Sequence, residues 1–306
     1  MIANHENDSI SLVDLVARTK IGELDLRPGK IDTADRGKPG GAYPFWVAVK
    51  GDREVYVSSQ RDRQVVVVDI GDGAPRLLQR IAVGGQPNKM LLNRDQRLLF
   101  VANGNSDTVS VIDTDRHKVI EEFATTAPRE VFGNREKLKG SNPNSLALTP
   151  DERFLMVSNG GTNSVAVIKL SRAARKDADR REREKDDDDD DEALGNDGSA
   201  SNGDRVGRAK GRNKSHVVGL IPTGFYPNSV STSKDGSMLY IVNGKSNAGP
   251  NPGACRNTSS IAPGSLDQCN AANQYVWQLT TAGFLSMPMP TGRELAGLAN
   301  LASGQE

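Results

Sequence analysis

Residues 101–113 read VANGNSDTVSVID, in which two β-branched stretches flank a polar turn. Three other segments follow the same plan: IANHENDSISLVD from residue 2, VSSQRDRQVVVVD from residue 57 and VSNGGTNSVAVIK from residue 157. In the quoted segment Asn103 stands ten residues before Asp113, and the other three segments keep that spacing between an Asn or Ser and an Asp or Lys. A fixed internal spacing indicates one structural unit that the chain repeats.

A second motif, Gly-x-x-Pro, begins each of four units and ends at Pro44, Pro87, Pro143 and Pro227. From each proline to the next Asn-type position the spacing is 15 or 16 residues. The gaps between units vary much more than the spacing inside them, so we place the insertions in loops.

Each unit divides into four short strands, which in the unit of Pro87 we assign to residues 87–93, 97–103, 108–113 and 118–124. The RDQR, PDER and KDGS segments have the turn chemistry of tight hairpins. Val, Ile and Leu form near-continuous runs in the second and third strands, which indicates burial on both faces. The sequence therefore predicts an all-β fold, a β-propeller of four-stranded antiparallel blades with the first strand of each unit innermost.

Composition excludes several classes of function. The 306 residues carry a formal net charge of zero and the pI is near 6.9, which gives no reason to expect a nucleic-acid partner. No apolar run approaches the roughly 18 residues of a membrane span. Neither a G-x-G-x-x-G nor a G-x-x-x-x-G-K-[ST] loop occurs, so we expect no cofactor.

The stretch VANGNSDTVSVIDTDRHKVIEEF resembles the YVTN-type β-propeller repeat of bacterial surface and periplasmic proteins. The ending QYVWQLTTAGFLSMPMPTG, followed by RELAGLANLA, resembles a narrower family in which such a propeller precedes a phosphoesterase domain of the alkaline-phosphatase superfamily. This resemblance implies about five blades of a seven-bladed propeller in residues 1–292. It also implies that residues 293–306 are a short C-terminal helix, the start of a linker to a phosphoesterase domain absent from this chain.

The longest loops, residues 27–43, 125–142 and 244–273, are expected on one face, together with the Gly-x-x-Pro turns. Loops on a rigid scaffold often carry function, so we expect a protein partner or a small ligand there. Asn after Pro is also ordinary turn chemistry, and a purely structural role stays open. The candidate binding residues flank the four prolines: Tyr43, Phe45, Gln86, Asn88, Asn142, Asn144, Tyr226 and Asn228.

Residues 171–214 form a charged insertion on the opposite face, with 12 basic and 13 acidic residues. Such a segment cannot bury enough apolar surface to offset its ordering entropy, so we expect it to be disordered. Its acidic run, residues 186–192, does not follow the alternation of a calcium-binding loop, and we expect no metal site.

Cys255 and Cys269 are the only cysteines, and both lie in the loop of residues 244–273. An isolated pair at this spacing favours one disulfide and hence an extracytoplasmic location, periplasmic or secreted. The same loop contains no His, which argues against a zinc site.

Catalytic residues are not apparent. The three histidines, His5, His117 and His216, fall on turns or strand ends, and the predicted inner strands contain only Lys50 and Lys89 as ionisable residues. We therefore expect no catalytic or metal-binding residue, and a non-catalytic binding or scaffold module. The alternative is a propeller hydrolase of lactonase type, which would need acidic or His residues lining the channel.

Overall fold

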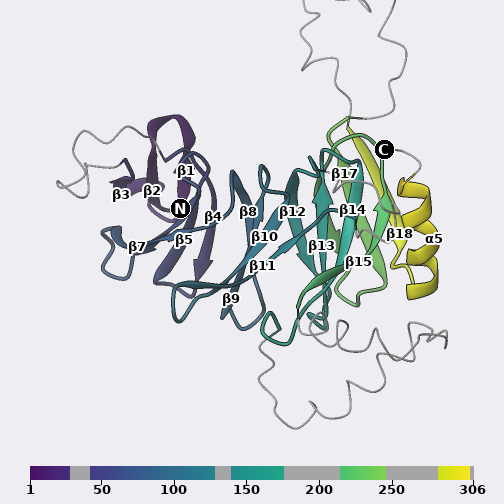
Figure 1. Cartoon of the computed structure of the whole chain (residues 1–306). Coiled ribbons are helices and arrows are strands. Elements are labelled where there is room, and N and C mark those ends of the chain that lie inside the picture. Colours follow the sequence, from purple (N-terminus) through teal and green to yellow (C-terminus); the bar gives the residue numbers. More distant parts are fainter. Residues whose placement is uncertain (28–41, 128–138, 176–213, 246–281, 304–306) are drawn as a thin grey trace, which may run out of the picture.

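The computed structural model describes residues 1–27, 42–127, 139–175, 214–245 and 282–303. In these residues the chain forms five antiparallel sheets that lie side by side in chain order (Figure 1). Three sheets have four strands and two have three. The predicted all-β propeller fold is therefore confirmed, and we number its sheets as the first to fifth blades.

The strands follow the repeat closely. The first blade contains β1 (Ile2–Asn4), β2 (Ser9–Asp14) and β3 (Thr19–Asp25), with the short 3-10 helix η1 (His5–Asn7) between β1 and β2. The second contains β4 (Pro44–Lys50), β5 (Glu54–Ser59), β6 (Gln64–Asp69) and β7 (Arg76–Ala82). The third contains β8 (Pro87–Leu92), β9 (Leu98–Asn103), β10 (Thr108–Asp113) and β11 (Lys118–Ala124). The fourth contains β12 (Pro143–Leu148), β13 (Phe154–Asn159), β14 (Ser164–Lys169) and β15 (His216–Pro222). The fifth contains β16 (Pro227–Thr232), β17 (Met238–Asn243) and β18 (Gly283–Pro288), and the helix α5 (Gly292–Ser303) packs on β15.

The strands that begin with the four prolines are the innermost ones. β4 lies next to β8, β8 next to β12, and β12 next to β16, so these strands line the inside of the arc. In the fifth blade β18 pairs with β17, with Asn243 opposite Gly283. Residues 283–288 thus hold the third-strand position of this blade.

The apolar runs are buried because each one faces two neighbouring blades. On β6, Val65 and Val67 pack in one cluster with Leu99 of the third blade. The alternate residues Val66 and Val68 pack in another cluster with Ile10 of the first blade. Since successive side chains of a strand point to opposite faces, a continuous run is needed to fill both seams.

The repeated Asn and Asp residues hold the blade together from inside. Asn103 donates from Nδ2 to the hydroxyls of Thr108, at 3.1 Å, and Ser110, at 2.8 Å. Asp113 accepts from the backbone N–H groups of Asp115 and Arg116 at 3.0 and 3.1 Å. These contacts close the turns on either side of β10, so the repeat encodes turn chemistry rather than a ligand set.

The residue before each inner-strand proline adopts a left-handed backbone conformation, with φ of 44° at Tyr43, 52° at Gln86, 49° at Asn142 and 54° at Tyr226. A non-glycine residue in this region costs roughly 1–2 kcal/mol. Backbone hydrogen bonds offset the cost: the carbonyl of Asn142 accepts from Gly160 at 3.1 Å, and the other three carbonyls accept from the corresponding residues of their blades.

Asparagines that follow two of the inner-strand prolines form hydrogen bonds to the neighbouring blade. Asn144 donates from Nδ2 to the carbonyl of Pro227 at 3.0 Å and accepts from the Ser158 hydroxyl at 2.7 Å. A Cβ on Gly160 would lie only 2.7 Å from Asn144 Nδ2, so a glycine is required where the asparagine crosses to the next blade.

The charged insertion leaves and rejoins the fourth blade through a closed hydrogen-bonded base. The Ser171 amide donates to Ser215 Oγ at 2.9 Å. Glu121 of the third blade accepts from the Ser171 hydroxyl and from the Ser215 amide, both at 2.6 Å. This base holds β14 and β15 in register regardless of what the chain does between them.

Several expectations concern residues outside the described ranges. These are the disulfide between Cys255 and Cys269, nearly all of the loop of residues 244–273, and most of the charged insertion. Among the described residues, no helix has both the length and the apolar character needed to cross a membrane.

Replacing Asn144 should weaken the seam between the fourth and fifth blades. In Asn144→Ala the carbonyl of Pro227 and the hydroxyl of Ser158 both lose a partner, which should cost about 1–3 kcal/mol of unfolding free energy. Urea denaturation measures the change. The matched control is Asn228→Ala, at the same repeat position but solvent-exposed, which should change stability by less than about 0.5 kcal/mol. Equal losses in both variants would contradict this role for Asn144.

Removing the insertion should leave the propeller intact. When a short Gly-Ser linker replaces residues 176–213, the unfolding free energy should change by less than about 1 kcal/mol, because closure entropy depends weakly on loop length. Thermal and urea unfolding measure this. Glu121→Ala, which opens the base of the insertion, should by contrast destabilise the chain. Loss of folding on removing the insertion would show that the base is not sufficient.

Candidate functional site

The eight residues predicted on the loop-rich face do not share one role. Asn88 is buried and Asn144 partly buried, and both make contacts between blades. Phe45, Tyr226 and Asn228 are exposed at the mouth of the channel. The other three are partly exposed, and their backbones are held in the turns before the prolines: Tyr43, Gln86 and Asn142.

Around Tyr43 the structure brings together groups that the sequence pattern did not connect. The His5 ring stacks on the Tyr43 ring with centroids 5.0 Å apart and an angle of 23° between the planes. The Arg61 guanidinium carbon lies 5.5 Å from the centroid of the same ring. An imidazole, a phenol and a guanidinium from separate blade segments therefore meet at one place on this face.

A chain of amides connects His5 to the inner strands, and a backbone carbonyl fixes its direction. Asn88 Nδ2 donates to the carbonyl of Pro143 at 3.2 Å, which leaves Asn88 Oδ1 to accept from Gln60 Nε2 at 2.8 Å. Gln60 must then turn Oε1 toward His5 Nε2, at 3.4 Å. Because the Pro143 carbonyl can only accept, the orientation of both amides is determined.

The other ring nitrogen of His5 faces a carboxylate. His5 Nδ1 lies 3.0 Å from Glu6 Oε1. Both nitrogens of His5 thus face acceptor oxygens, so a neutral imidazole can donate to only one of them and an imidazolium donates to both. These two contacts fix the orientation of the imidazole ring.

The two lysines of the inner strands differ sharply. Lys50 forms an ion pair with Asp115 at 2.9 Å. Lys89 Nζ instead lies 5.5 Å from the centroid of the Trp46 ring and donates to the backbone carbonyl of Asn228 at 3.0 Å. Burial lowers the pKa of Lys89 below the ordinary value for a lysine.

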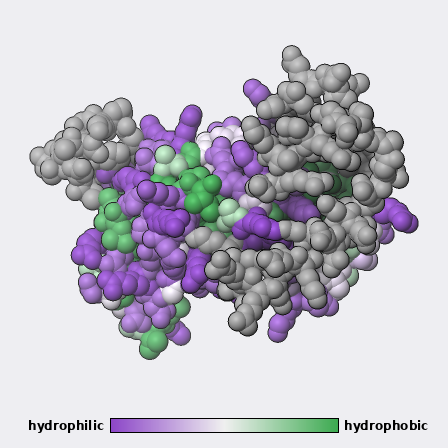
Figure 2. Space-filling view, turned by 60° about the horizontal axis from the view of Figure 1, so that its bottom comes forward, coloured by the Kyte–Doolittle hydropathy of each residue, from purple (hydrophilic) through white to green (hydrophobic). Residues whose placement is uncertain are grey.

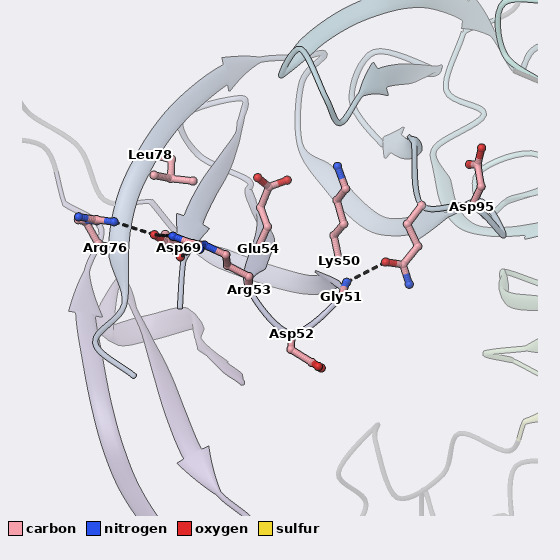
Figure 3. Close-up of a pocket in the computed structure, with 10 residues that line it drawn as sticks. Lys50, Gly51, Asp52, Arg53, Glu54, Asp69, Arg76, Leu78 and Asp95 are labelled. Carbon is pink, nitrogen blue, oxygen red and sulfur yellow. Dashed lines mark hydrogen bonds and ion pairs between the residues drawn. The ribbon is translucent and has the colours of Figure 1, made fainter. Parts of the chain in front are cut away.

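A second concave site lies at the opposite ends of the blades, between the second and third blades. It is an open cavity of about 620 Å³, lined by Lys50, Gly51, Asp52, Arg53, Glu54, Asp69, Arg76, Leu78, Asp95 and Gln96 (Figure 3). The view in Figure 2 brings the bottom of Figure 1 forward, and its described part is mostly hydrophilic with a few separate hydrophobic patches. The polar lining of the cavity matches that surface.

Most charges in this cavity already have partners. Asp69 binds Arg76 at 2.7 Å and Arg53 at 3.3 Å. The backbone amide of Gly71, then Arg76, lower the pKa of Asp69 to about 2. Glu54 pairs with His117 at 3.0 Å. Among the described residues no group of three or more His, Cys, Asp or Glu is placed to hold a metal ion.

A family model matches more than half of this chain. The family model described as "Lactonase, 7-bladed beta-propeller" matches residues 16–184, more than half of the chain. The protein therefore belongs to the seven-bladed β-propeller lactonase family.

Individual relatives agree on the fold. Over 158 residues the chain is 28% identical to the seven-bladed β-propeller protein Rv1057 of Mycobacterium tuberculosis, a match that covers 40% of this chain and 39% of the relative. A crystal structure of a proposed 6-phosphogluconolactonase from Bacteroides fragilis superposes with a TM-score of 0.50 at 14% identity, covering 79% of this chain and 59% of the other. A similar protein from Bacteroides uniformis gives 0.46 at 11%, covering 67% and 48%. The chain thus spans less than two thirds of the length of each relative.

The expectation of a non-catalytic module without enzymatic activity is wrong, because the family that matches is a lactonase family. That expectation rested on the scarcity of ionisable residues in the inner strands. The structure also shows polar groups that this count left out: His5, Glu6 and Gln60 lie on turns beside the strands rather than on the strands themselves. A count restricted to strands could not include them.

Asp69 should make the unfolding free energy of this protein depend on pH in the acid range. Its pKa of about 2 in the folded chain lies below the value near 3.9 of an unfolded aspartate, so its contribution is present above about pH 4 and is lost as the pH falls toward 2. Asp69→Asn should be less stable than the wild type at neutral pH, and the difference should vanish in that acid range. Urea denaturation at several pH values tests this, with Asp52→Asn, at an exposed residue of the same cavity, as the control. A difference that does not vary with pH would contradict the assignment.

Proposed function

We propose that this protein is a hydrolase of lactonase type whose reaction takes place at the channel mouth, beside His5 and Tyr43. The observation that carries the proposal is the match of residues 16–184 to the seven-bladed lactonase family. The His5 ring stacks on Tyr43 and is connected to the inner strands by hydrogen bonds through Gln60 and Asn88, which supports this location.

Lactone hydrolysis requires a base to activate water and a donor to return a proton to the leaving alcohol. His5 can take the proton from a water molecule that attacks the lactone carbonyl. The imidazolium that forms donates to Glu6 and to Gln60, whereas the neutral ring donates to only one of them. The two acceptors thus hold the ring in place while it takes and returns the proton. The same proton can then pass to the ring oxygen as the C–O bond breaks.

Neighbouring groups have distinct parts in this scheme. Glu6 is largely exposed, so its effect on His5 is one of orientation more than of charge. The Tyr43 ring holds the imidazole plane, and Arg61 supplies a positive charge close to the face where the carbonyl oxygen becomes negative. The orientation of Gln60 is in turn fixed by Asn88 and the Pro143 carbonyl.

Further predictions from the sequence extend this proposal. The repeat resembles YVTN-type propellers with a covalently linked phosphoesterase domain, and the pair Cys255 and Cys269 favours an extracytoplasmic location. The exposed residues Phe45, Tyr226 and Asn228 are suited to contact a ligand or protein partner on the same face. Each of these points stays a prediction.

Substitution of His5 tests the proposed base. In His5→Gln the rate of lactone hydrolysis should fall by about 10²–10⁴-fold, because proton transfer in the transition state is lost. Initial rates on a panel of five- and six-membered lactones, followed with a pH indicator, measure this.

The matched control for His5 is His216→Gln. His216 is exposed on β15, its Nδ1 contacts the carbonyl of Lys214, and the substitution should leave the rate unchanged. An unchanged rate in His5→Gln would remove His5 from the mechanism. No hydrolysis of any lactone by the wild-type chain would contradict the proposed function itself.

A further inference from the structure

We propose that Lys89 is a reactive amine at the channel mouth, which condenses with small apolar aldehydes to form an imine. This is a covalent reaction distinct from lactone hydrolysis, and it does not depend on His5 or its partners. The proposal rests on the position of Lys89 among three inner strands, on the absence of a carboxylate partner and on the aromatic surface beside it.

The contacts of Lys89 place its amine inside the arc of inner strands. Lys89 lies on β8 of the third blade, but Nζ contacts the Trp46 ring of β4 in the second blade and the carbonyl of Asn228 on β16 in the fifth. The fourth blade lies between β8 and β16. A single nitrogen that contacts the second and fifth blades must lie in the space that the inner strands share.

The charge of Lys89 is less well stabilised than that of comparable lysines. Lys50, also on an inner strand, is paired with Asp115 at 2.9 Å, and Lys20 is paired with Glu23 at 2.6 Å. In the part of the chain that the structure describes, no carboxylate lies within ion-pair distance of Lys89. The carbonyl of Asn228 can accept from a neutral amine as well as from an ammonium ion.

Two effects on the protonation of Lys89 oppose each other. The Trp46 face favours the ammonium ion. Removal of the amine from water favours the neutral form and lowers its pKa, and no carboxylate counters it. A desolvated lysine in an apolar setting is the usual form of an amine nucleophile in proteins.

The surroundings favour an apolar carbonyl compound over a charged one. The Trp46 side chain, whose ring lies beside Lys89 Nζ, is 37% exposed. Apolar surface therefore remains open to a ligand beside Lys89. An aldehyde with an alkyl or aryl group could rest on this surface while its carbonyl carbon meets Nζ.

The reaction balances without an added oxidant or reductant. The lone pair of Nζ attacks the aldehyde carbon and forms a C–N bond, while the C=O π electrons move to oxygen, which takes a proton from water. The nitrogen then loses one proton to the hydroxide ion that this leaves, and a second N–H proton departs with the hydroxyl group as water while the C=N bond forms. Amine and aldehyde thus give an imine and one molecule of water.

The test compares lysines within one molecule of wild-type protein. Butyraldehyde with sodium cyanoborohydride at about pH 7, where an ordinary lysine is almost fully protonated, converts each imine to a stable alkylated lysine that peptide mass spectrometry counts. Lys89 should be modified several-fold faster than Lys50 and the exposed Lys118. In urea-unfolded protein this advantage should disappear, because it depends on the fold.

Two further measurements make the outcome decisive. Lys50→Arg should leave modification of Lys89 unchanged, while Lys89→Arg should remove the fast-reacting site and leave the other lysines as before. Modification of Lys89 at or below the rate of Lys118 would overturn the proposal. Slow modification that inorganic phosphate slows further would also overturn it, because it would identify Lys89 as a charged anion-binding group instead.

Discussion

A hydrogen bond between neighbouring blades sets the geometry of the channel mouth. The residue just before β2, β10 or β14 accepts a hydrogen bond through its side chain. The donor is a backbone N–H of the next blade, that of the residue before the inner-strand proline. Asp8 does this for Tyr43 at 2.9 Å, Asp107 for Asn142 at 3.0 Å and Asn163 for Tyr226 at 2.8 Å. These N–H groups belong to residues with left-handed backbone conformations, and the hydrogen bonds add to the backbone contacts that hold them.

One seam departs from this rule, the seam that the hydrogen bond between Gln60 and Asn88 crosses. Between the second and third blades Arg63 takes the place of the acceptor, and Gln60 bonds to Asn88 instead. Gln60 occupies the position of Gly104 and Gly160, and Phe45 occupies that of Asn88 and Asn144. Without an asparagine after Pro44 the glycine is no longer required, so a longer side chain fits there and reaches His5.

The strands could be predicted from the sequence because the same strand pattern recurs in several units. β10 and β11 coincide with the predicted residues 108–113 and 118–124, and β8 and β9 differ from prediction by a single residue. The contacts that make up the proposed site could not be predicted in the same way. His5 and Gln60 are 55 residues apart in the sequence, and Gln60 and Asn88 are 28 residues apart. A signal in the sequence that could have directed attention to the proposed site is the departure of the second blade from the repeat at Phe45 and Gln60.

Two histidine–carboxylate pairs occur in the described part of the chain, and their surroundings decide which one suits catalysis. One pair is His117 and Glu54, whose side chains are both about one fifth exposed. The second carboxylate oxygen of Glu54 accepts a hydrogen bond from the buried hydroxyl of Tyr56. Each group of that pair is occupied in joining the second and third blades. The other pair is His5 and Glu6, in which the His5 side chain is 39% exposed. Its Nε2 has only the long contact to Gln60 among the described residues. Acid–base chemistry requires a nitrogen that a water molecule can reach, and of the two pairs only the one at the channel mouth meets that requirement.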